Sequence, residues 1–288
     1  MYSLTIMIST ARPEIPIRTR SWMFSPATHP EHFGKALEAG ADVLIIDLED
    51  AVALERKAQA RTNVCALLDA PRDDALVPPV AVRINTPSSR SGIDDLIALL
   101  DARFEPAFIL LPKIESPEQV AQVHSLLTGA GKSAHLVPLI ESARGRSAVR
   151  AIAVACTRVA ALMFGAADYA SDVRAQPSSL ALQFARCEVA SACAEAGIAA
   201  IDSPCFALHD EAQLALDLDF ATGNGFLAKA AIHPSHIAPI NAAFTPSPAR
   251  LDWAHRVVTA SEQGAGTVDG QMVDEAIARE ARRVIASS

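Results

Sequence analysis

Acidic and basic residues recur where short apolar segments of the chain end, and their chemistry suits a metal ion and an anionic substrate. Several carboxylates with one or two cations around a shared cavity are what a hard divalent metal and an anion require. In chain order these residues are Ser25, Asp47, Glu49, Asp50, Arg83, Asn85, Lys113, Glu115, Glu141, Asp168, Asp202 and His233. If the segments are parallel strands of a barrel, we expect these side chains to converge at one mouth.

Glu141 and Asp168 are the candidate metal ligands. Glu141 lies in L-I-E-S-A-R-G, where Ser142 is the better helix cap, so the glutamate has no obvious local role. Asp168 lies in F-G-A-A-D-Y, where the preceding glycine lets the backbone approach a ligand closely. Acids that follow strands also cap helices, and Asp50 or Asp202 could do only that.

Two cations could bind anions at the same mouth. Arg83, in V-R-I-N, suits bidentate binding of a carboxylate, and the alternative is a salt bridge to Glu49 or Asp50. Lys113 could hold a phosphate, or it could pair with Glu115. The residue types alone leave both pairs of alternatives open.

Other chemistries lack their motifs. The sequence contains no G-x-S-x-G, Walker loop, G-x-G-x-x-G or H-E-x-x-H. His233, in A-I-H-P-S-H, has no acid at a metal-ligand spacing, so we expect it to shape a loop.

The apolar segments themselves predict the fold. They are separated by stretches with an amphipathic helical pattern, the alternation expected of parallel strands joined by crossover helices. We expect strands at residues 21–24, 43–47, 80–84, 108–111, 136–140, 159–164, 199–202 and 227–233. Eight such units in 288 residues predict an α/β fold of the (β/α)₈ TIM-barrel type, whose usual size is roughly 250 residues.

Helix signals agree with this pattern. Thr28 followed by Glu31 predicts a capping box for a helix that runs to Gly40. Ser116, Pro117 and Glu118 form an N-cap, a first-position proline and a first-turn acid.

The C-terminal segment is longer than a barrel needs. We expect an N-terminal extension over residues 1–19, a catalytic barrel over 20–245 and a C-terminal helical extension over 246–288. Within the last of these, the sequence predicts a helix over 249–263, a glycine-rich turn over 264–270 and a final helix from about Val273.

The composition excludes several classes of protein. With 33 acidic and 25 basic residues the net charge is −8, which makes nucleic acid and anionic membrane poor partners. The five cysteines show no C-x-x-C spacing, so we expect reduced thiols and a cytoplasmic protein. The apolar stretch 4–8 lacks the basic lead-in of a signal peptide, and region 151–167, interrupted by Arg158, is too short to span a bilayer.

Seven motifs in one order resemble the citrate lyase β-subunit-like family of the HpcH/HpaI aldolase superfamily, which includes malyl-CoA and citramalyl-CoA lyases. They are L-E-D-A-V at 48–52, V-R-I-N at 82–85, L-P-K-I-E at 111–115, L-I-E-S-A-R-G at 139–145, G-A-A-D-Y at 165–169, A-I-H-P-S at 231–235 and G-Q-M-V-D at 270–274. The resemblance, from about Arg20 onward, implies a homotrimeric TIM barrel. It also implies Mg²⁺-dependent cleavage of a 3-hydroxyacyl thioester, citramalyl-CoA or malyl-CoA, into acetyl-CoA and a small 2-oxo acid.

The resemblance also implies roles at the reacting end of the substrate. By motif match, Glu141 and Asp168 resemble direct metal ligands, Glu49 and Asp50 resemble acids that act on the metal through waters, and Arg83 resembles the arginine that holds the oxo-acid carboxylate, helped by the backbone at Gly165 and Ala166.

Further roles concern CoA and the proton. Lys35 matches a position associated with the CoA phosphates, and Ile232, His233 and Pro234 match a loop beside the CoA adenine. Asp274 resembles an aspartate that reaches a neighbouring subunit's site and acts as acid/base on the acetyl carbon. Without the resemblance, a first-turn acid of the final helix is an equal interpretation of Asp274.

Two other functions remain open at this point. One is a citrate lyase β subunit, which cleaves a citryl group carried by an acyl carrier protein; the other is a non-catalytic acyl-thioester-binding protein. Ala167 stands where relatives commonly carry an acid, a departure that bears on the side chain of the substrate and not on the chemistry.

Overall fold

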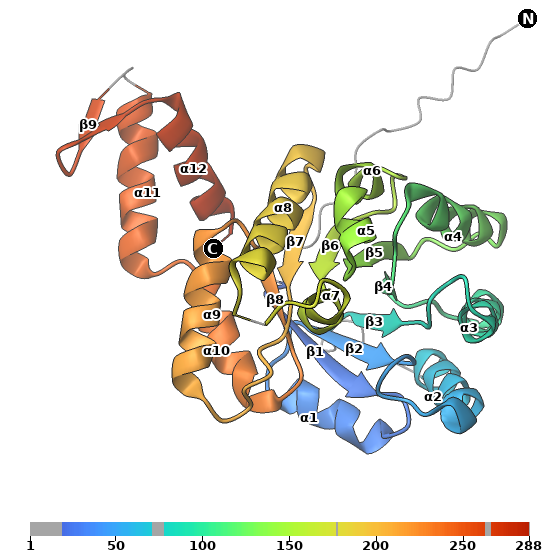
Figure 1. Cartoon of the computed structure of the whole chain (residues 1–288). Helices are drawn as coiled ribbons and strands as arrows, with labels where there is room; N and C mark the ends of the chain where they lie inside the picture. Colours follow the sequence, from blue (N-terminus) through green and yellow to red (C-terminus); the bar gives the residue numbers. More distant parts are fainter. Residues whose placement is uncertain (1–18, 71–77, 177, 263–265, 288) are drawn as a thin grey trace, which may run out of the picture.

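The computed structural model describes residues 19–70, 78–176, 178–262 and 266–287, and eight parallel strands within them close into a barrel (Figure 1). The strands are β1 (Ser21–Pro26), β2 (Val43–Asp47), β3 (Val80–Arg83), β4 (Phe108–Leu111), β5 (His135–Ile140), β6 (Ala161–Phe164), β7 (Ala199–Asp202) and β8 (Ala228–Ala231). β1 pairs with β8 to close the barrel. The predicted fold class and the eight strands are therefore confirmed, and every predicted boundary lies within two residues of the observed one.

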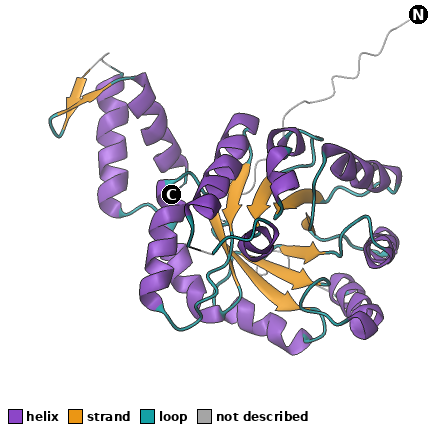
Figure 2. Ribbon diagram, viewed as in Figure 1, coloured by secondary structure: helices purple, strands orange, loops and turns teal. Residues whose placement is uncertain are grey.

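Helices connect the strands and cover the outside of the barrel, as Figure 2 shows. The helical segments of the barrel are η1 (Pro30–His32), α1 (Phe33–Glu38), η2 (Leu54–Arg56), α2 (Lys57–Asp69), α3 (Arg90–Asp101), α4 (Pro117–Gly129), α5 (Ala143–Ser147), α6 (Val149–Ala153), α7 (Ala166–Asp172), α8 (Leu180–Ala196), α9 (Glu211–Gly223), η3 (Pro234–His236) and α10 (Ile237–Ala243). Within the described residues, no helix is both long and apolar enough to cross a membrane.

Alternation along the strands divides the core into two layers. Trp22, Phe108 and Met163 belong to a cluster inside the barrel, whereas Ile46 and Phe164 belong to the layer between barrel and helices. Successive side chains of a strand point to opposite faces, so each strand contributes to both layers. This parity decides which strand-end residues can face the mouth of the barrel.

The helix signals were partly correct. Ser116 caps α4 and Pro117 takes its first position, as predicted, and Gln119 completes a reciprocal capping box that was not predicted. The predicted Thr28–Glu31 box is wrong, because Pro30 begins a short 3₁₀ turn and α1 starts only at Phe33. Gly40, with φ of +77°, follows the end of that helix as predicted.

The C-terminal segment folds around a small core of its own. Helices α11 (Pro248–Ser261) and α12 (Glu275–Ala286) pack together with a hairpin of β9 (Gly266–Val268) and β10 (Gln271–Val273), and Figure 1 shows this unit beside the barrel. Both helices agree with prediction within two residues. The hairpin was missed because strands of three residues are too short to show alternation, although Asp269 and Gly270, both with positive φ, form a typical hairpin turn. The proposed domain boundary at 245/246 falls between α10 and α11 and stays a prediction.

Candidate active site

A cavity of about 430 Å³ opens at the carboxyl ends of the barrel strands. Its polar wall contains Asp47, Asp50, Arg83, Glu141 and Asp168, and its apolar wall contains Phe24, Leu139, Met163, Pro204, Phe206 and Ile232. The polar residues come from four different strands or the loops that follow them. The strand-end rule applied to the sequence therefore located this mouth correctly.

Strand parity explains why these side chains meet. Ile45, Ala81 and Leu139 point into the barrel, and Asp47, Arg83 and Glu141 each lie two residues further along the same strand or just past its end. Because the side-chain period of a strand is two, these residues continue the inward-facing rows. The cavity is thus the polar top of the barrel interior.

Three carboxylates crowd one side of the mouth. Glu49 and Glu141 are buried, and Asp168 lies on the first turn of α7. Burial, together with the charges of Glu49 and Asp168, raises the pKa of Glu141 to about 8. Burial also raises the pKa of Glu49, although Arg83 and Lys113 oppose that shift. An added cation would favour the ionised form of these acids.

Gly165 makes room for Glu141. A Cβ atom at position 165 would lie 2.5 Å from Oε2 of Glu141 and 2.6 Å from its Cβ, closer than any side chain can approach. The other carboxylate oxygen, Oε1, accepts a hydrogen bond of 2.6 Å from the backbone N–H of Lys113. We expected this glycine to admit a ligand; the structure shows that it admits the glutamate, which is held in one place from both sides.

Arg83 bridges two acids at the mouth. Its Nε and Nη2 donate to the two oxygens of Asp47 at 2.7 and 2.6 Å, and its Nη1 lies 3.3 Å from Glu49. The Phe24 ring lies 4.7 Å from the guanidinium carbon. Although burial alone would lower it, the pKa of Arg83 is raised by the hydrogen bonds to Asp47. The alternative of a salt bridge to Glu49 is thus present, and the principal partner, Asp47, was not predicted.

Lys113 pairs with different acids from the one considered. Its Nζ lies 2.7 Å from Glu49 and 3.5 Å from Asp50, whereas Glu115 instead accepts from Ser142. With φ of +55°, Lys113 has an unusual backbone conformation for a lysine. In this conformation the backbone N–H of Lys113 donates to Glu141 and its ammonium group faces Glu49. One residue therefore contacts two of the three acids.

A buried lysine supports the loop that carries Glu49 and Asp50. The Nζ of Lys57 donates to the carbonyl oxygens of Leu48 and Glu49 at 2.7 and 2.6 Å. The Leu48 carbonyl also accepts from Asn85. Sequence reasoning missed Lys57; its one signal was a cation, next to Arg56, at the start of a helix five residues after the L-E-D-A-V motif.

A second cavity, of about 300 Å³, adjoins the first. Lys35, Ile232, His233 and Pro234, the residues matched to CoA binding, all line it together with His32. Both cavities share lining residues from β1 and from the loop after β8, which makes them neighbours at one mouth. The His233 ring accepts from the backbone N–H of Ser235, so it shapes the loop as expected.

Two predicted acids lie elsewhere. Asp202 points outward from β7 and pairs with Arg186 and Lys229 at 2.7 and 2.6 Å, so the expectation that it joins the mouth is wrong. Its neighbour Ile201 faces the barrel interior, which leaves Asp202 the opposite face. Asp274 caps α12 by accepting from the N–H of Ile277 and does not line either cavity described here.

The carboxylate set fits Mg²⁺. The candidate ligands offer oxygen only, and the two carboxylate oxygens of buried Glu49 face the cations of Lys113 and Arg83, at 2.7 and 3.3 Å. Hard divalent cations prefer such oxygen donors, often through waters. Glu141 and Asp168 would bind the ion directly, and Glu49 and Asp50 would act on it through waters, as the motif match implies.

Comparison with known proteins agrees with these features. Residues 20–234 match the HpcH/HpaI aldolase/citrate lyase family. The mitochondrial citramalyl-CoA lyase of Homo sapiens is 28% identical over 292 residues, which cover 93% of this chain and 85% of that protein. The crystal structure of RipC from Yersinia pestis is 42% identical with a TM-score of 0.71 and covers 82% of this chain and 99% of its own. The crystal structure of CitE from Mycobacterium tuberculosis with magnesium, acetoacetate and coenzyme A is 31% identical, with a TM-score of 0.79. The match covers 94% of this chain and 99% of the CitE chain.

Proposed function

Because the chain belongs to the HpcH/HpaI aldolase/citrate lyase family, whose members here are carbon–carbon lyases, we propose that it cleaves a 3-hydroxyacyl-CoA into acetyl-CoA and a 2-oxo acid. The substrate proposed is citramalyl-CoA or malyl-CoA, which releases pyruvate or glyoxylate. The observation that carries this proposal is the grouping of Glu141, Asp168 and Arg83 around one cavity.

Arg83 binds and orients the carboxylate next to the reacting hydroxyl. Its Nη1 and Nη2 each have a second N–H, and Phe24 and Asp47 fix the plane of the guanidinium group. The backbone at Gly165 and Ala166, where α7 begins, borders the same carboxylate. Glu141 and Asp168 would hold Mg²⁺, which would supply Lewis-acid chemistry that lowers the pKa of the substrate hydroxyl and favours formation of the oxo acid.

The adjoining cavity takes the CoA end of the substrate. Lys35 provides the positive charge for CoA phosphates, and the loop with Ile232, His233 and Pro234 forms another part of the cavity wall. CitE was crystallised with coenzyme A and magnesium together, which supports the two-cavity arrangement proposed for this chain.

Proton transfer to the acetyl carbon requires a further acid, and Asp274 is the proposed one. Asp274 caps a helix in the C-terminal unit and does not line the cavity of its own chain, so the proposed role requires the site of a neighbouring subunit. We therefore propose a homotrimer in which each C-terminal unit completes another subunit's site.

The five free cysteines support the cytoplasmic location proposed from the sequence.

The apolar wall favours a substrate with a small apolar group. Leu139 and Met163 form its buried base, and Phe206 forms part of its rim. Arg83 is the single basic residue among those that line this cavity within the described chain. A methyl group suits this wall, whereas the additional carboxylate of a citryl group lacks a second cation. Citramalyl-CoA thus ranks ahead of a citryl thioester.

The test is acetyl-CoA release by the purified protein from citramalyl-CoA, malyl-CoA and citryl thioesters, with Mg²⁺ and with EDTA. We expect Mg²⁺-dependent turnover, fastest on citramalyl-CoA. Arg83→Lys should lower kcat/KM by about tenfold to a hundredfold because it loses the bidentate geometry, and the exposed Arg144→Lys should not. Turnover only on a citryl group bound to a carrier protein would favour the citrate lyase β subunit, and no turnover on any of them would contradict a lyase acting on these substrates.

A further inference from the structure

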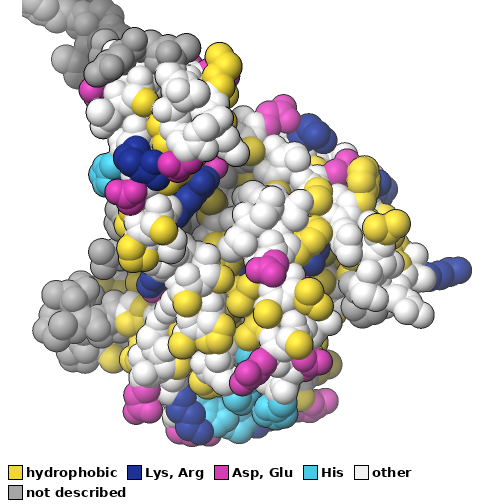
Figure 3. Space-filling view, turned by 90° about the vertical axis from the view of Figure 1, so that its left-hand side faces the viewer, with side chains coloured by type: hydrophobic (Ala, Val, Ile, Leu, Met, Phe, Trp, Pro, Cys, Tyr) yellow, Lys and Arg dark blue, Asp and Glu magenta, His cyan; other side chains and the backbone are white. Residues whose placement is uncertain are grey.

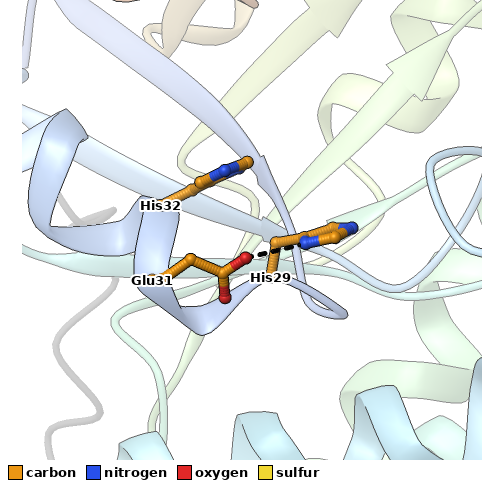
Figure 4. Close-up of side chains that lie close together, drawn as sticks. All are labelled: His29, Glu31 and His32. Atoms are coloured by element: carbon orange, nitrogen blue, oxygen red, sulfur yellow. Dashed lines mark hydrogen bonds and ion pairs between the residues drawn. The ribbon is translucent and has the colours of Figure 1, made fainter.

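A second group of metal-ligating side chains lies on the surface, on residues that do not line the carboxylate cavity. His29, Glu31 and His32 each direct one ligand atom toward the others, and all three atoms lie within 4.8 Å of one another. Figure 4 shows the two imidazole rings and the carboxylate around the same turn. The imidazole rings are nearly parallel, with centroids 5.2 Å apart and 17° between their planes.

The backbone positions this group without help from an ion. Pro30 occupies the first position of η1, where its ring restricts φ. The N–H of His29 donates to Pro26 and the N–H of His32 donates to His29, so the turn is closed by hydrogen bonds on both sides. The three side chains then emerge from four consecutive residues, and only side-chain rotation is needed to bring their ligand atoms together.

An ordinary ion pair explains only part of this arrangement. Nδ1 of His29 lies 2.9 Å from Oε1 of Glu31, which accounts for those two residues. Within the described part of the chain, no hydrogen bond reaches the ring nitrogens of His32, although its ring is stacked on that of His29. A shared ion would use all three side chains.

We propose that His29, Glu31 and His32 bind a divalent transition-metal ion of the Zn²⁺ class. Two imidazoles and one carboxylate are a typical ligand set for such an ion, and water completes the coordination because the side chains are partly exposed. The donor set separates this site from the cavity acids, whose oxygen-only ligands suit Mg²⁺.

The site adjoins the second cavity. His32 lines that cavity with Lys35 and His233. Figure 3 shows histidine side chains gathered along one edge of the face that it draws, and ring contacts join His209 to His233 and His233 to His236. A bound ion therefore adds positive charge beside Lys35 and holds the His32 ring in one orientation.

The test is titration of the untagged full chain with Zn²⁺ by calorimetry, with millimolar Mg²⁺ present to fill the carboxylate site. We expect one equivalent of Zn²⁺ per chain. His29→Ala and His32→Ala should each weaken the affinity at least about tenfold. His255→Ala removes an exposed histidine from α11 and should leave the affinity unchanged.

Cobalt provides a second, spectroscopic readout. Co²⁺ bound by the three side chains should give visible absorption bands that disappear in His32→Ala and persist in His255→Ala. Zn²⁺ binding that Mg²⁺ abolishes, or that survives both cluster substitutions unchanged, would overturn the proposal. Circular dichroism of each variant confirms that the substituted proteins are folded.

Discussion

Oε2 of Glu141 lies 2.5 Å from the point where a Cβ of residue 165 would be. The carboxylate of the proposed metal ligand therefore fills space that is free only because residue 165 is a glycine. The contact joins the end of β5 to the end of β6, two neighbouring strands of the barrel. Backbone spacing between strands is fixed by their hydrogen bonds, so the side chain is the part that must yield.

Gly165→Ala should displace the Glu141 carboxylate and weaken Mg²⁺ binding by at least about tenfold, an effect comparable to loss of a supporting contact in metal sites. Calorimetric titration with Mg²⁺ measures this. Gly129→Ala is the matched control, because a Cβ there meets nothing within 4 Å in the last turn of α4. Equal Mg²⁺ affinity in Gly165→Ala and wild type would show that Glu141 is not a ligand or relocates freely.

Lys57→Met should weaken Mg²⁺ binding without altering any residue of the cavity. It removes the donor to the carbonyls of Leu48 and Glu49 and so releases the loop that carries Glu49 and Asp50. The unpaired carbonyls also cost about 1–3 kcal/mol of the free energy of unfolding. Calorimetric titration measures the Mg²⁺ affinity of the variant, and urea unfolding measures its free energy of unfolding.

Lys132→Met is the matched control for Lys57. Lys132 also donates to a backbone carbonyl, the partly buried one of Ala102 at 2.6 Å. It lies in the loop that leads into β5, at the opposite end of the barrel from the cavity. The Lys132→Met variant should lose stability and keep its Mg²⁺ affinity. A parallel loss of affinity in both variants would assign Lys57 a general structural role.

Glu141→Gln should change how Mg²⁺ affects thermal stability. Crowding of Glu49, Glu141 and Asp168 disfavours the ionised site when no cation is bound, so the substitution should raise the Tm measured in EDTA. Mg²⁺ should raise the Tm of the wild type, since a ligand stabilises the state that binds it, and not that of the variant. A Tm increase with Mg²⁺ in Glu141→Gln equal to that of wild type would place the ion elsewhere.

His135, at the start of β5, should make the fold less stable in mild acid. Burial, with the charge of Arg158, lowers its pKa below the ordinary 6.5, while Glu105 opposes this. His135 therefore binds a proton more readily in the unfolded chain than in the folded one. The stability that the neutral ring contributes is lost as the pH falls below 6.5 toward the lowered pKa of the folded state. The ring also lies 5.8 Å from that of Phe108.

The pH effect is measured as the free energy of unfolding at about pH 8 and about pH 5, which lie on either side of an ordinary histidine pKa. His135→Gln should lose less stability between these two values than wild type does. His255→Gln, at an exposed position, should behave as wild type. An identical acid loss in His135→Gln would assign the effect to other groups.

The sequence by itself determined the barrel and the location of its mouth. Apolar segments at regular spacing identified all eight strands, and the acids that follow them, Glu141 and Asp168 above all, were found in the cavity. These features are local: strand alternation and the residue that ends each strand can be read within a short window. The N-cap at Ser116 is local in the same way.

Only the tertiary structure decided which polar residues pair. Asp47 binds Arg83 across 36 positions and Lys57 reaches back to Glu49, whereas Asp202, also at a strand end, turns away to Arg186. Such pairings depend on strand register and on which face each side chain takes, and a single residue of shift reverses that face. The clash that reserves position 165 for glycine is likewise a contact between neighbouring strands, invisible until both are placed.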